Sequence, residues 1–275
     1  MIRFAIAGAT GRMGRAVLEQ ADGDDRFTVA AAITISDDPL LGQSVRTGAA
    51  EVSLVDRIEG PCDVLIDFTL PAGTMHWLDE CVQRKIAMVI GATGHDPAQL
   101  DRITKAAASI PIVKATNFSL GVNALLVVAK QLATALGSDY DIEIVETHHR
   151  RKVDAPSGTA ASFLEAVQAG RAAKMPTSKG ILSSGGSPQN EGGTVVHGRQ
   201  GETGPRPKGE IGVHSLRMGD VVGQHEIHFG GPGETITITH TAHSRTTFAA
   251  GALHAAAWLI GKPPGLYTMA DVIGL

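Results

Sequence analysis

One short segment of the chain gathers the groups that could move a proton and hold an anion. Residues 146–159 contain two adjacent histidines, three fixed cations and two carboxylates, followed by a Ser-Gly-Thr sequence that opens a predicted helix. An imidazole has an ordinary pKa of about 6.5, so it can donate and recover a proton near neutral pH. Hydroxyl and N–H groups at a helix start bind anions. The segment therefore predicts an anion-binding site with a proton donor beside it.

The two histidines are not expected to serve the same pocket. His148 and His149 are adjacent near the end of a predicted strand, where successive side chains point to opposite faces. A histidine pair on a surface strand is more often solvated than functional. Here the cation of Lys152 and the small donors of Ser157-Gly158-Thr159 follow within the same segment, and this combination favours a functional interpretation.

Length, composition and charge limit the class of protein. The chain has 275 residues, 43% of them hydrophobic and 19% charged, which is typical of a globular protein with room for two domains. A net charge of −4 and an aromatic content of 4% predict neither the basic surface nor the stacking platforms of a nucleic-acid-binding protein. We therefore expect small-molecule partners.

Targeting and membrane signals favour a cytoplasmic protein. The N-terminal apolar run is short and is followed by Arg12 and Arg15, unlike a signal peptide. The longest low-charge run, residues 119–129, is well short of a membrane span. Only two cysteines occur, which fits a reducing compartment. We expect no membrane segment.

The N-terminus carries a glycine pattern that fits a dinucleotide. Residues 2–7 alternate as a strand, the glycines fall at Gly8, Gly11 and Gly14, and residues 11–20 have helical spacing. The pattern is G-x-x-G-x-x-G, where the common fingerprint is G-x-G-x-x-G. Glycines between a first strand and a first helix let the backbone approach a pyrophosphate at the helix N-terminus. Dinucleotide binding is therefore favoured over an ordinary tight turn.

The end of the second predicted strand leaves the choice of nucleotide open. After residues 27–33, a dinucleotide fold usually places an acid for the ribose hydroxyls, but here Thr34 and Ile35 follow. The carboxylates of Asp37 and Asp38 come a few residues late and are equally consistent with a loop. An arginine clamp for a 2′-phosphate is also missing from this stretch. NADH and NADPH both remain possible.

Three further strands alternate with helices. Residues 63–68, 86–90 and 110–115 have the character of buried strands, and the segments between them read as helices ending near residues 84 and 108. This alternation predicts right-handed crossovers and a parallel sheet. Each strand ends in small polar residues, which plausibly line a cofactor cleft at the carboxyl edge. Ordinary turn chemistry explains any one of these ends equally well.

The pattern changes in the second half of the chain. After a long apolar helix at 119–137, residues 140–147 alternate as an antiparallel or edge strand. A helix at 157–173 follows. We expect a meander-like sheet with hairpins at Gly219-Asp220 and Gly230–Gly233, built from residues 211–218, 221–229 and 234–242.

The remaining segments complete the domain organisation. Residues 175–209 are rich in Gly, Pro and Ser, and we expect the part up to about residue 193 to be mobile. Residues 246–261 regain helical spacing and are predicted to pack on the first domain. The expected domains are residues 1–118 with 246–275 for the dinucleotide, and residues 119–245 for the substrate.

Two other kinds of site are disfavoured. His225 and His228 lie three residues apart on a predicted strand, as do His240 and His243, so each pair points to opposite faces and makes a poor metal site. We expect no metal. Serine and histidine occur in number, but no nucleophile-elbow context for a hydrolase triad is present.

Several motifs spread over nearly the whole chain have the residues and order of one known family. They are Gly8-Ala-Thr-Gly-Arg-Met-Gly14, Asp67-Phe-Thr69, Gly91-Ala-Thr-Gly94, Asn117-Phe-Ser119, Glu146-Thr-His-His-Arg-Arg-Lys-Val-Asp-Ala-Pro-Ser-Gly-Thr159, Arg199-Gln-Gly-Glu-Thr-Gly204, Arg217-Met-Gly-Asp-Val-Val-Gly223 and Ser244-Arg-Thr-Thr-Phe248. With these motifs the chain resembles the 4-hydroxy-tetrahydrodipicolinate reductase family, also called the dihydrodipicolinate reductase family.

The resemblance implies a fold and a reaction. The expected fold is α/β, with an N-terminal Rossmann-type parallel-sheet domain plus a C-terminal α+β domain that binds substrate and forms the oligomer through a mixed or antiparallel sheet. The expected reaction is the NADH- or NADPH-dependent reduction of a cyclic dicarboxylate in lysine and diaminopimelate synthesis. The family is typically a homotetramer assembled through the second-domain sheets, which would explain apolar strand faces there.

The resemblance also implies roles for particular residues. His148 matches the proton donor and Lys152 its cationic partner. The residues that match those holding the substrate carboxylates in the family are His149, Ser157, Gly158, Thr159 and, less directly, Arg245. On the cofactor side, the residues that match the family are Gly8, Arg12, Met13, Gly91, Thr93, Asn117 and Phe118. From their places in the glycine pattern and at the strand ends, we also expect cofactor contacts from Gly11, Gly14, Thr34, Phe68, Thr69 and Thr116.

The chain departs from the family pattern at two places, and two rival functions stay open. Thr34 and Ile35 replace the acidic and arginine residues often found after the second strand, and the 175–193 segment is longer than usual. One rival is another two-domain NAD(P)-dependent oxidoreductase acting on an amino acid or a semialdehyde, which should lack the constellation from His148 to Thr159. The other is a redox sensor or scaffold that only binds the nucleotide.

Overall fold

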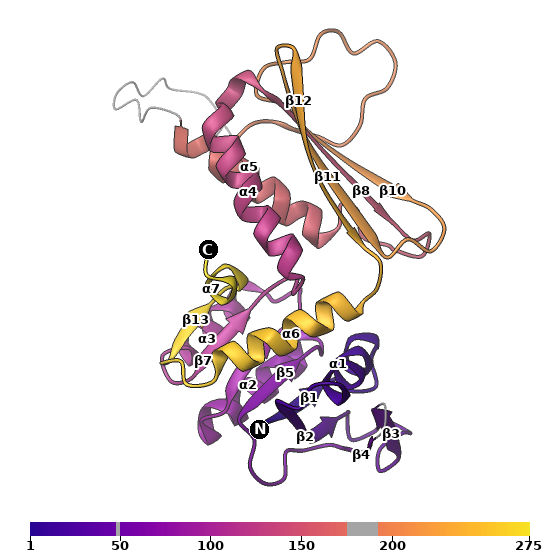
Figure 1. Cartoon of the computed structure of the whole chain (residues 1–275), viewed down its shortest axis with the longest axis vertical. Helices are drawn as coiled ribbons and strands as arrows, with labels where there is room; N and C mark the ends of the chain where they lie inside the picture. Colours follow the sequence, from indigo (N-terminus) through magenta and orange to yellow (C-terminus); the bar gives the residue numbers. More distant parts are fainter. Residues whose placement is uncertain (48–49, 175–191) are drawn as a thin grey trace. The chain divides into compact units, whose positions relative to one another are not determined.

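The chain divides into two compact units. The computed structural model describes residues 1–47, 50–174 and 192–275. Unit 1 comprises residues 1–120 and 244–275, and unit 2 comprises residues 121–243 (Figure 1). Most of the 175–193 segment, for which the sequence predicts mobility, lies outside the described residues.

Unit 1 is built on an eight-stranded sheet with the order β13-β7-β6-β5-β1-β2-β4-β3. Neighbouring strands run parallel throughout, except for the antiparallel β3–β4 hairpin. Its elements are β1 (Ile2–Ala7), α1 (Arg12–Asp22), β2 (Phe27–Ile33), β3 (Ser44–Thr47), β4 (Ala50–Val55), β5 (Val64–Asp67), α2 (Pro71–Arg84), β6 (Ala87–Ile90), α3 (Pro97–Ala106), β7 (Pro111–Lys114), α6 (Thr246–Leu259), β13 (Gly265–Tyr267) and α7 (Met269–Ile273).

The alternation of side chains along β1 explains why helices cover both faces of this sheet. Phe4 and Ile6 belong to the core that also contains buried residues of α1 and α6. Ala5 and Ala7 belong to a separate core with buried residues of α2 and α3. Since successive strand residues point to opposite faces, the continuous apolar run of residues 4–7 needs cover on both sides. Figure 1 shows the same layering.

The strand order creates a switch point beside β1. The chain runs from β1 to β2 on one side and then returns to β5, β6 and β7 on the other side. Crevices at such a switch point, outside the carboxyl ends of the strands, are where ligands bind in open α/β sheets. The parallel sheet and the return of α6 to it confirm the sequence-based predictions, while the β3–β4 hairpin, β13 and α7 were not predicted.

Unit 2 has a five-stranded mixed sheet with the order β12-β11-β8-β10-β9. Its elements are α4 (Leu120–Leu136), the 3₁₀ turn η1 (Gly137–Asp139), β8 (Asp141–His148), α5 (Gly158–Lys174), β9 (Val195–Val196), β10 (Ile211–Arg217), β11 (Gly223–Gly231) and β12 (Glu234–Ala242). The β11–β12 hairpin confirms the turn predicted at Gly230–Gly233, with Gly231 opposite Glu234.

The expectations for this sheet are met only in part. β8, predicted to be an antiparallel or edge strand, does pair antiparallel with β11, but it is the central strand, because it also pairs in parallel with β10. The Gly219-Asp220 turn is therefore not a hairpin, and the sheet is not a simple meander. Residues 218–222 instead step across the end of β8, where the Met218 N–H donates to His148 O at 2.9 Å and Gly219 O accepts from Arg150 N–H at 3.1 Å. This crossing brings residues distant in sequence to the end of β8.

The apolar face of the unit 2 sheet is covered by helices of the same unit. Residues of β8, β10, β11 and β12 form one buried cluster with Val122 and Ala129 of α4 and with Phe163 and Val167 of α5. On the other face, β12 presents exposed threonines at positions 235, 237, 239 and 241. Packing within the unit therefore accounts for this apolar face, and assembly between copies stays a prediction.

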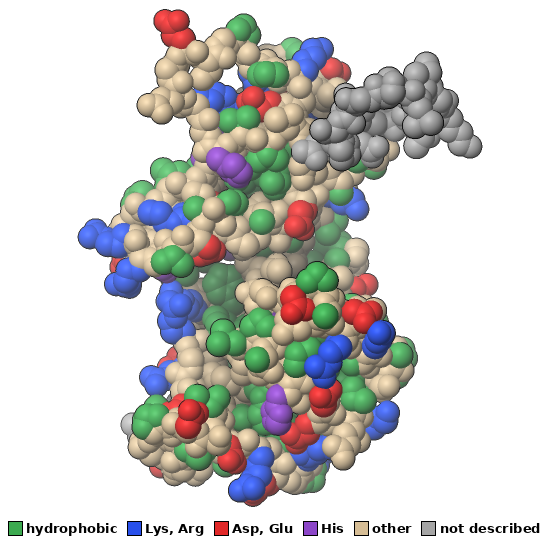
Figure 2. Space-filling view, turned by 180° about the vertical axis from the view of Figure 1, so that it is seen from behind, with side chains coloured by type: hydrophobic (Ala, Val, Ile, Leu, Met, Phe, Trp, Pro, Cys, Tyr) green, Lys and Arg blue, Asp and Glu red, His purple; other side chains and the backbone are tan. Residues whose placement is uncertain are grey.

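One helical stretch in the described part of the chain passes a length and composition test for a membrane span. It is Leu120–Asp139, which comprises α4 and η1. Core helices of soluble proteins pass the same test, and Val122, Ala129 and Ala133 of this helix are buried in the unit 2 core. The surface of unit 1, in the lower half of Figure 2, intersperses acidic and basic side chains.

Candidate active site

The residues predicted to hold a nucleotide come together at the carboxyl edge of the unit 1 sheet. Each follows the end of a parallel strand: β1, β2, β5, β6 or β7. They are Gly8, Gly11, Arg12, Met13 and Gly14 after β1, Thr34 after β2, Phe68 and Thr69 after β5, Gly91 and Thr93 after β6, and Thr116, Asn117 and Phe118 after β7.

The glycine loop has room for backbone only. Gly8 has φ +84°, a left-handed conformation, and a Cβ built there would lie 2.9 Å from Phe68 O. A Cβ on Gly14 would lie 2.2 Å from Gly8 O, so α1 can start this close to the strand only with glycine. The loop is tied to the next strand because Gly8 N–H and Ala9 N–H both donate to Ile33 O, at 3.0 and 2.9 Å.

The start of α1 fits the phosphates of a dinucleotide. Its N-cap, Gly11, makes no side-chain capping bond, and the first turn contains no acidic residue and begins with Arg12. Uncapped N–H groups at a helix start carry a partial positive charge and bind phosphate. Together with the close backbone approach at Gly8 and Gly14, these residues fit a pyridine dinucleotide.

Aromatic and hydroxyl groups complete this edge of the sheet. A Cβ on Gly91 would lie 2.3 Å from the Phe68 ring, and that ring meets the Phe118 ring edge-on with centroids 5.8 Å apart. Thr69 is fixed by the buried Asp67 carboxylate, which accepts from Thr69 N–H at 2.9 Å and from Thr69 Oγ1 at 2.6 Å. These contacts hold the turn after β5 in one arrangement.

Asp38 returns to the end of β2 although it comes four residues after Thr34. Its Oδ2 accepts hydrogen bonds from Thr34 Oγ1 and, at 3.2 Å, from Thr10 Oγ1 of the glycine loop. Its Oδ1 accepts from Leu40 N–H at 2.9 Å. The hydrogen bond from Thr34 is the main reason that the pKa of Asp38 lies below its ordinary value.

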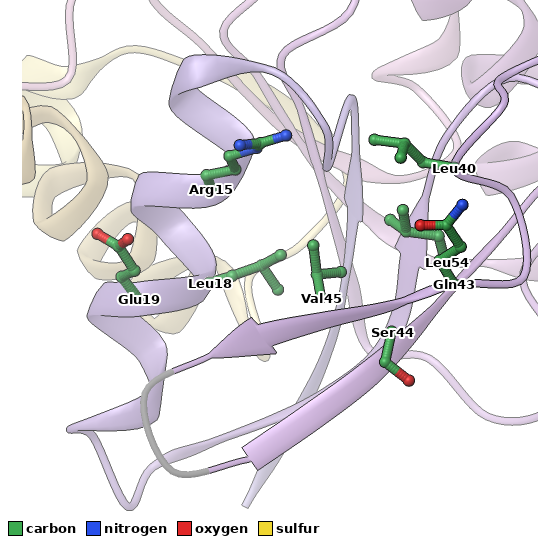
Figure 3. Close-up of a pocket in the computed structure, with 8 residues that line it drawn as sticks. All are labelled: Arg15, Leu18, Glu19, Leu40, Gln43, Ser44, Val45 and Leu54. Atoms are coloured by element: carbon green, nitrogen blue, oxygen red, sulfur yellow. The ribbon is translucent and has the colours of Figure 1, made fainter.

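A hollow of about 340 Å³ lies between α1 and the β3–β4 hairpin (Figure 3). It is lined by Arg15, Leu18, Glu19, Leu40, Gln43, Ser44, Val45 and Leu54. None of these residues belongs to the 146–159 segment, and the hollow lacks the histidines that could move a proton. The groups that could move a proton lie instead at the end of β8.

At the end of β8 in unit 2, a buried carboxylate fixes the side chain of His148. Glu146 is fully buried, and its Oε2 accepts a hydrogen bond from His148 Nδ1 at 2.5 Å. Residues two apart on a strand share a face, which is why these side chains meet. On the far side of the ring, a Cβ on Gly223 would lie only 3.1 Å from His148 Nε2, so glycine makes room for the imidazole.

Arg217 and the residue before α5 donate further hydrogen bonds to the Glu146 carboxylate. Arg217 Nη1 and Nη2 donate to its two oxygens at 2.9 and 2.8 Å, and Ser157 N–H donates at 3.2 Å. Burial would raise the pKa of Glu146, but the hydrogen bonds from Arg217, Ser215 and His148 outweigh it and lower the pKa to about 2. Glu146 is therefore an anion at neutral pH, and donors surround both of its oxygens.

A second buried histidine supports the same cluster. The His225 ring meets the His148 ring edge-on with centroids 5.2 Å apart, and its Nε2 lies 3.1 Å from Ser157 Oγ. Ser157 Oγ also accepts from Ala160 N–H at 3.2 Å, as an N-cap of α5 does. Burial lowers the pKa of His225 to about 4, so this ring is neutral and His148 remains the titrating member of the pair.

The pKa of His148 is also below its ordinary value. Burial is the main cause, and the Glu146 hydrogen bond and charge oppose it, while the positive charges of Lys152 and Arg217 act with burial. The free site therefore holds a neutral imidazole near pH 7. An approaching anion would favour the protonated form, because opposite charges stabilise each other.

Lys152 and His149 complete the segment. Lys152 Nζ donates to both carboxylate oxygens of Asp154, at 2.8 and 2.7 Å. The Lys152 side chain is 19% exposed and that of Asp154 57% exposed. Among the described residues, His149 Nδ1 is buried without a hydrogen-bond partner, which is a group that a ligand could satisfy.

Arg245 lies apart from this cluster in the chain. It is the N-cap residue of α6 and belongs to the 244–275 segment of unit 1. All the other residues predicted for catalysis or substrate binding lie in unit 2, within residues 148–159.

Comparison with protein families decides between the candidate interpretations. Residues 2–118 match the family model described as dihydrodipicolinate reductase, N-terminus, and residues 121–273 match the one described as dihydrodipicolinate reductase, C-terminus. The chain belongs to the dihydrodipicolinate reductase family.

Full-length relatives agree with this membership. The chain is 44% identical over 275 residues to 4-hydroxy-tetrahydrodipicolinate reductase of Akkermansia muciniphila, covering 100% of this chain and 99% of that protein. It is 41% identical over 282 residues to the reductase of the same name from Psychrobacter arcticus, covering 100% and 96%. A solved structure, dipicolinate-bound dihydrodipicolinate reductase from Paenisporosarcina sp. TG-14, has 26% identity and a TM-score of 0.72, covering 99% of both chains.

Membership of the dihydrodipicolinate reductase family confirms the resemblance drawn from the motifs. The chain is an enzyme, an oxidoreductase, and its N-terminal half is the nucleotide-binding Rossmann domain of that family. The predicted two-domain α/β fold is likewise confirmed.

The sequence interpretation missed three members of the cluster. Glu146 lay in the central segment without an assigned role, Arg217 was noted only as part of a motif, and His225 was considered only as a metal ligand. The signal that unites them is strand register, since Arg217 pairs with His148 and His225 pairs with Glu146. A correct pairing of β8 with β10 and β11 would have found them.

Proposed function

We propose that the protein reduces 4-hydroxy-tetrahydrodipicolinate, by way of dihydrodipicolinate, to tetrahydrodipicolinate in diaminopimelate and lysine biosynthesis. Loss of water from the 4-hydroxy compound gives a conjugated cyclic imine. A hydride then joins C4 and a proton joins the neighbouring carbon. Overall, one NAD(P)H and one proton are consumed, and NAD(P)⁺ and water are released. The observation that carries the proposal is the Glu146–His148 pair beside Lys152, in a chain of this family.

The cofactor is proposed to bind at the carboxyl edge of the unit 1 sheet. Bound NADH or NADPH supplies the hydride. The glycine loop and the start of α1 are proposed to hold its phosphates, and the other predicted residues to line its ribose and nicotinamide ends. They are Gly8, Gly11, Arg12, Met13, Gly14, Thr34, Phe68, Thr69, Gly91, Thr93, Thr116, Asn117 and Phe118.

His148 is proposed to donate the proton. A neutral ring whose Nδ1–H donates a hydrogen bond to Glu146 has no proton on Nε2, so proton donation to the substrate requires the imidazolium. Binding of a dicarboxylate raises the pKa of His148 by adding negative charge, and Glu146 stabilises the charged ring through Nδ1. Substrate binding and proton uptake are therefore coupled, and Nε2–H becomes the donor.

The carboxylates are proposed to be held by Lys152, the α5 start and His149. A substrate carboxylate at Lys152 must replace Asp154, which is more than half exposed and can turn to water. Ser157, Gly158 and Thr159 lie at the N-terminus of α5, where the helix dipole favours an anion. Arg245 is proposed as a further cation for the substrate, on the strength of the family motif alone.

Assembly and location are also proposals. The family resemblance supports a homotetramer in the cytoplasm, formed through the sheet of unit 2. Light scattering on the purified protein tests the oligomeric state, and a mass of one or two chains would contradict it. We propose no nucleic-acid or membrane partner.

The proposed reaction is tested with freshly generated substrate. Pyruvate and aspartate semialdehyde are condensed by the preceding enzyme of the pathway, and the oxidation of NADH and of NADPH by the purified protein is followed by absorbance. We expect oxidation only when both precursors and the condensing enzyme are present. If folded protein oxidises neither NADH nor NADPH under these conditions, the result would contradict the proposed reaction. Oxidation with aspartate semialdehyde alone would favour the rival oxidoreductase.

A further inference from the structure

The end of β2 carries a fixed negative charge in the place where a dinucleotide fold meets the ribose of the adenosine half. Thr34, which follows β2, is only 8% exposed, and the Asp38 carboxylate lies against its hydroxyl. The same carboxylate accepts from Thr10 Oγ1 at 3.2 Å and from Leu40 N–H at 2.9 Å. Three donors from three parts of the chain therefore hold one carboxylate.

These bonds fix Asp38 relative to the phosphate-binding loop. Thr10 lies within the glycine loop, and Thr10 Oγ1 is 3.3 Å from Thr34 Oγ1. The loop is also joined to β2, since Gly8 N–H and Ala9 N–H share Ile33 O as their acceptor. The carboxylate therefore keeps a set position beside the start of α1. In this fold the acid at the end of the second strand binds the ribose hydroxyls.

The chemistry of this carboxylate discriminates between two nucleotides. Its low pKa keeps Asp38 ionised at neutral pH, with the Thr34 hydrogen bond as the main cause. A carboxylate has about four acceptor positions, and three are in use, so one remains for a hydroxyl. The 2′-hydroxyl of NADH offers a donor. The 2′-phosphate of NADPH offers further negative charge instead, which an ionised carboxylate repels.

Arg15 is the cation that could oppose this effect. Its Nε donates to Thr10 O at 3.1 Å, and Figure 3 shows its side chain extending from α1 toward the loop that carries Leu40. Arg15 is exposed, so water screens its charge, and its one described bond is to a carbonyl. Asp38 is held by three bonds and is partly buried. We therefore expect the Asp38 carboxylate, rather than Arg15, to determine which nucleotide binds more tightly.

We propose that Asp38 makes this protein prefer NADH to NADPH, by accepting a hydrogen bond from the adenosine ribose and repelling a 2′-phosphate. Thr10 and Thr34 act as positioning residues that hold the carboxylate. This inference rests on the proposed function, in which unit 1 binds NAD(P)H, and it names the nucleotide that the function leaves open.

Nucleotide binding by the full-length protein tests the inference without relying on turnover. NADH and NADPH are each titrated while nicotinamide fluorescence is recorded, for the wild type, Asp38→Asn and Asp37→Asn. Asp37 is the matched control, because it is the adjacent carboxylate, is exposed and loses the same charge. We expect the wild type to bind NADH roughly tenfold more tightly than NADPH. Asp38→Asn should reduce the ratio to within about threefold, and Asp37→Asn should leave it unchanged.

A second pair of variants keeps the test decisive if Asp38→Asn is poorly folded. Thr34→Val removes the main donor to Asp38 with little change in shape and should reduce the preference for NADH. Thr34→Ser restores a hydroxyl and should restore the preference. The thermal midpoint of each variant is measured alongside.

The outcomes separate this inference from the proposed function. A wild type that binds NADPH as tightly as NADH overturns the role of Asp38 and leaves the function standing. An Asp38→Asn variant that retains the wild-type ratio, or an Asp37→Asn variant that changes it equally, also overturns that role. If the folded wild type binds neither nucleotide, both proposals fall together.

Discussion

The carboxyl edge of the unit 1 sheet is shaped mainly by backbone, whereas the end of β8 in unit 2 is shaped by charged side chains. In unit 1, the decisive features are positions where any Cβ would collide, such as Gly8 and Gly14. In unit 2, the decisive feature is a buried carboxylate that accepts hydrogen bonds from His148, Arg217 and Ser157. The first arrangement suits a ligand whose phosphates the backbone must approach closely. The second suits a group whose protonation must change during the reaction.

This difference predicts that the two sites fail in different ways. Damage to the glycine loop should weaken nucleotide binding while the protonation of His148 stays intact. Damage to the Glu146 cluster should alter the rate and its pH dependence while nucleotide binding stays intact.

The largest effect is expected from loss of the proton donor. His148→Gln keeps a hydrogen-bonding side chain but has no titrating group, so kcat should fall by about 10²–10⁴-fold with a modest change in KM. Steady-state kinetics with saturating nucleotide measure both constants, and fluorescence titration should show unchanged nucleotide binding. His228→Gln, at a position where the histidine bonds Thr237, is the control and should retain activity. An unchanged kcat in His148→Gln would assign the acid to another residue.

An intermediate effect is expected from a single methyl group in the loop of unit 1. In Gly14→Ala the new Cβ would lie 2.2 Å from Gly8 O, so the loop must move. A misplacement of about 1 Å can already lower a reaction rate about 100-fold. Nucleotide affinity, measured by fluorescence, should fall by roughly 10- to 100-fold, with some loss of thermal stability. Gly23→Ala, after the same helix and with open space around it, is the matched control. Equal affinities in the two variants would contradict the close-approach argument.

The smallest effect is expected in the pH dependence of kcat and kcat/KM. A proton donor is lost as pH rises through its pKa, and burial lowers the pKa of His148 in the free enzyme. We therefore expect kcat/KM to decline with rising pH from below about 6.5, and kcat to decline only at higher pH, where bound dicarboxylate has raised that pKa.

Glu146→Gln tests the cause of this behaviour. Removing the carboxylate withdraws the interaction that stabilises the imidazolium, so the decline should move to lower pH. The protonated fraction of His148 near neutral pH should therefore fall, and kcat with it. Glu226→Gln, a half-buried carboxylate on β11 that bonds Gln224, is the control. A profile unchanged in Glu146→Gln would show that His148 does not depend on this partner.

Local patterns carried enough information to predict most elements and the segment that holds the chemistry. Strand and helix periods in residues 2–115 led to the parallel sheet, and the unusual set of side chains in residues 146–159 led to His148 and Lys152. These features depend on neighbours a few residues apart, where backbone geometry alone decides which side chains share a face. The β3–β4 hairpin was missed because its strands are short and have weak turn signals.

The partners of those residues could not be predicted in the same way. Arg217 reaches Glu146 from 71 positions away because β10 lies beside β8, and Ser157 meets His225 across 68 positions because β11 lies on the other side. The sequence suggested a hairpin at residues 219–220, which would have separated these groups. Only the pairing of strands, which minimises unpaired backbone and buries the apolar face together, selects the arrangement.

The sequence by itself therefore determined the family and the parallel nucleotide-binding sheet, and it predicted His148 as the proton donor. The tertiary structure decided which groups surround that histidine, and it brought Asp38 back to the end of β2 through hydrogen bonds with Thr10 and Thr34. The physical reason is the same in both cases. A charge or a proton affinity depends on the atoms within a few ångströms, and those atoms come from segments that only the folded chain brings together.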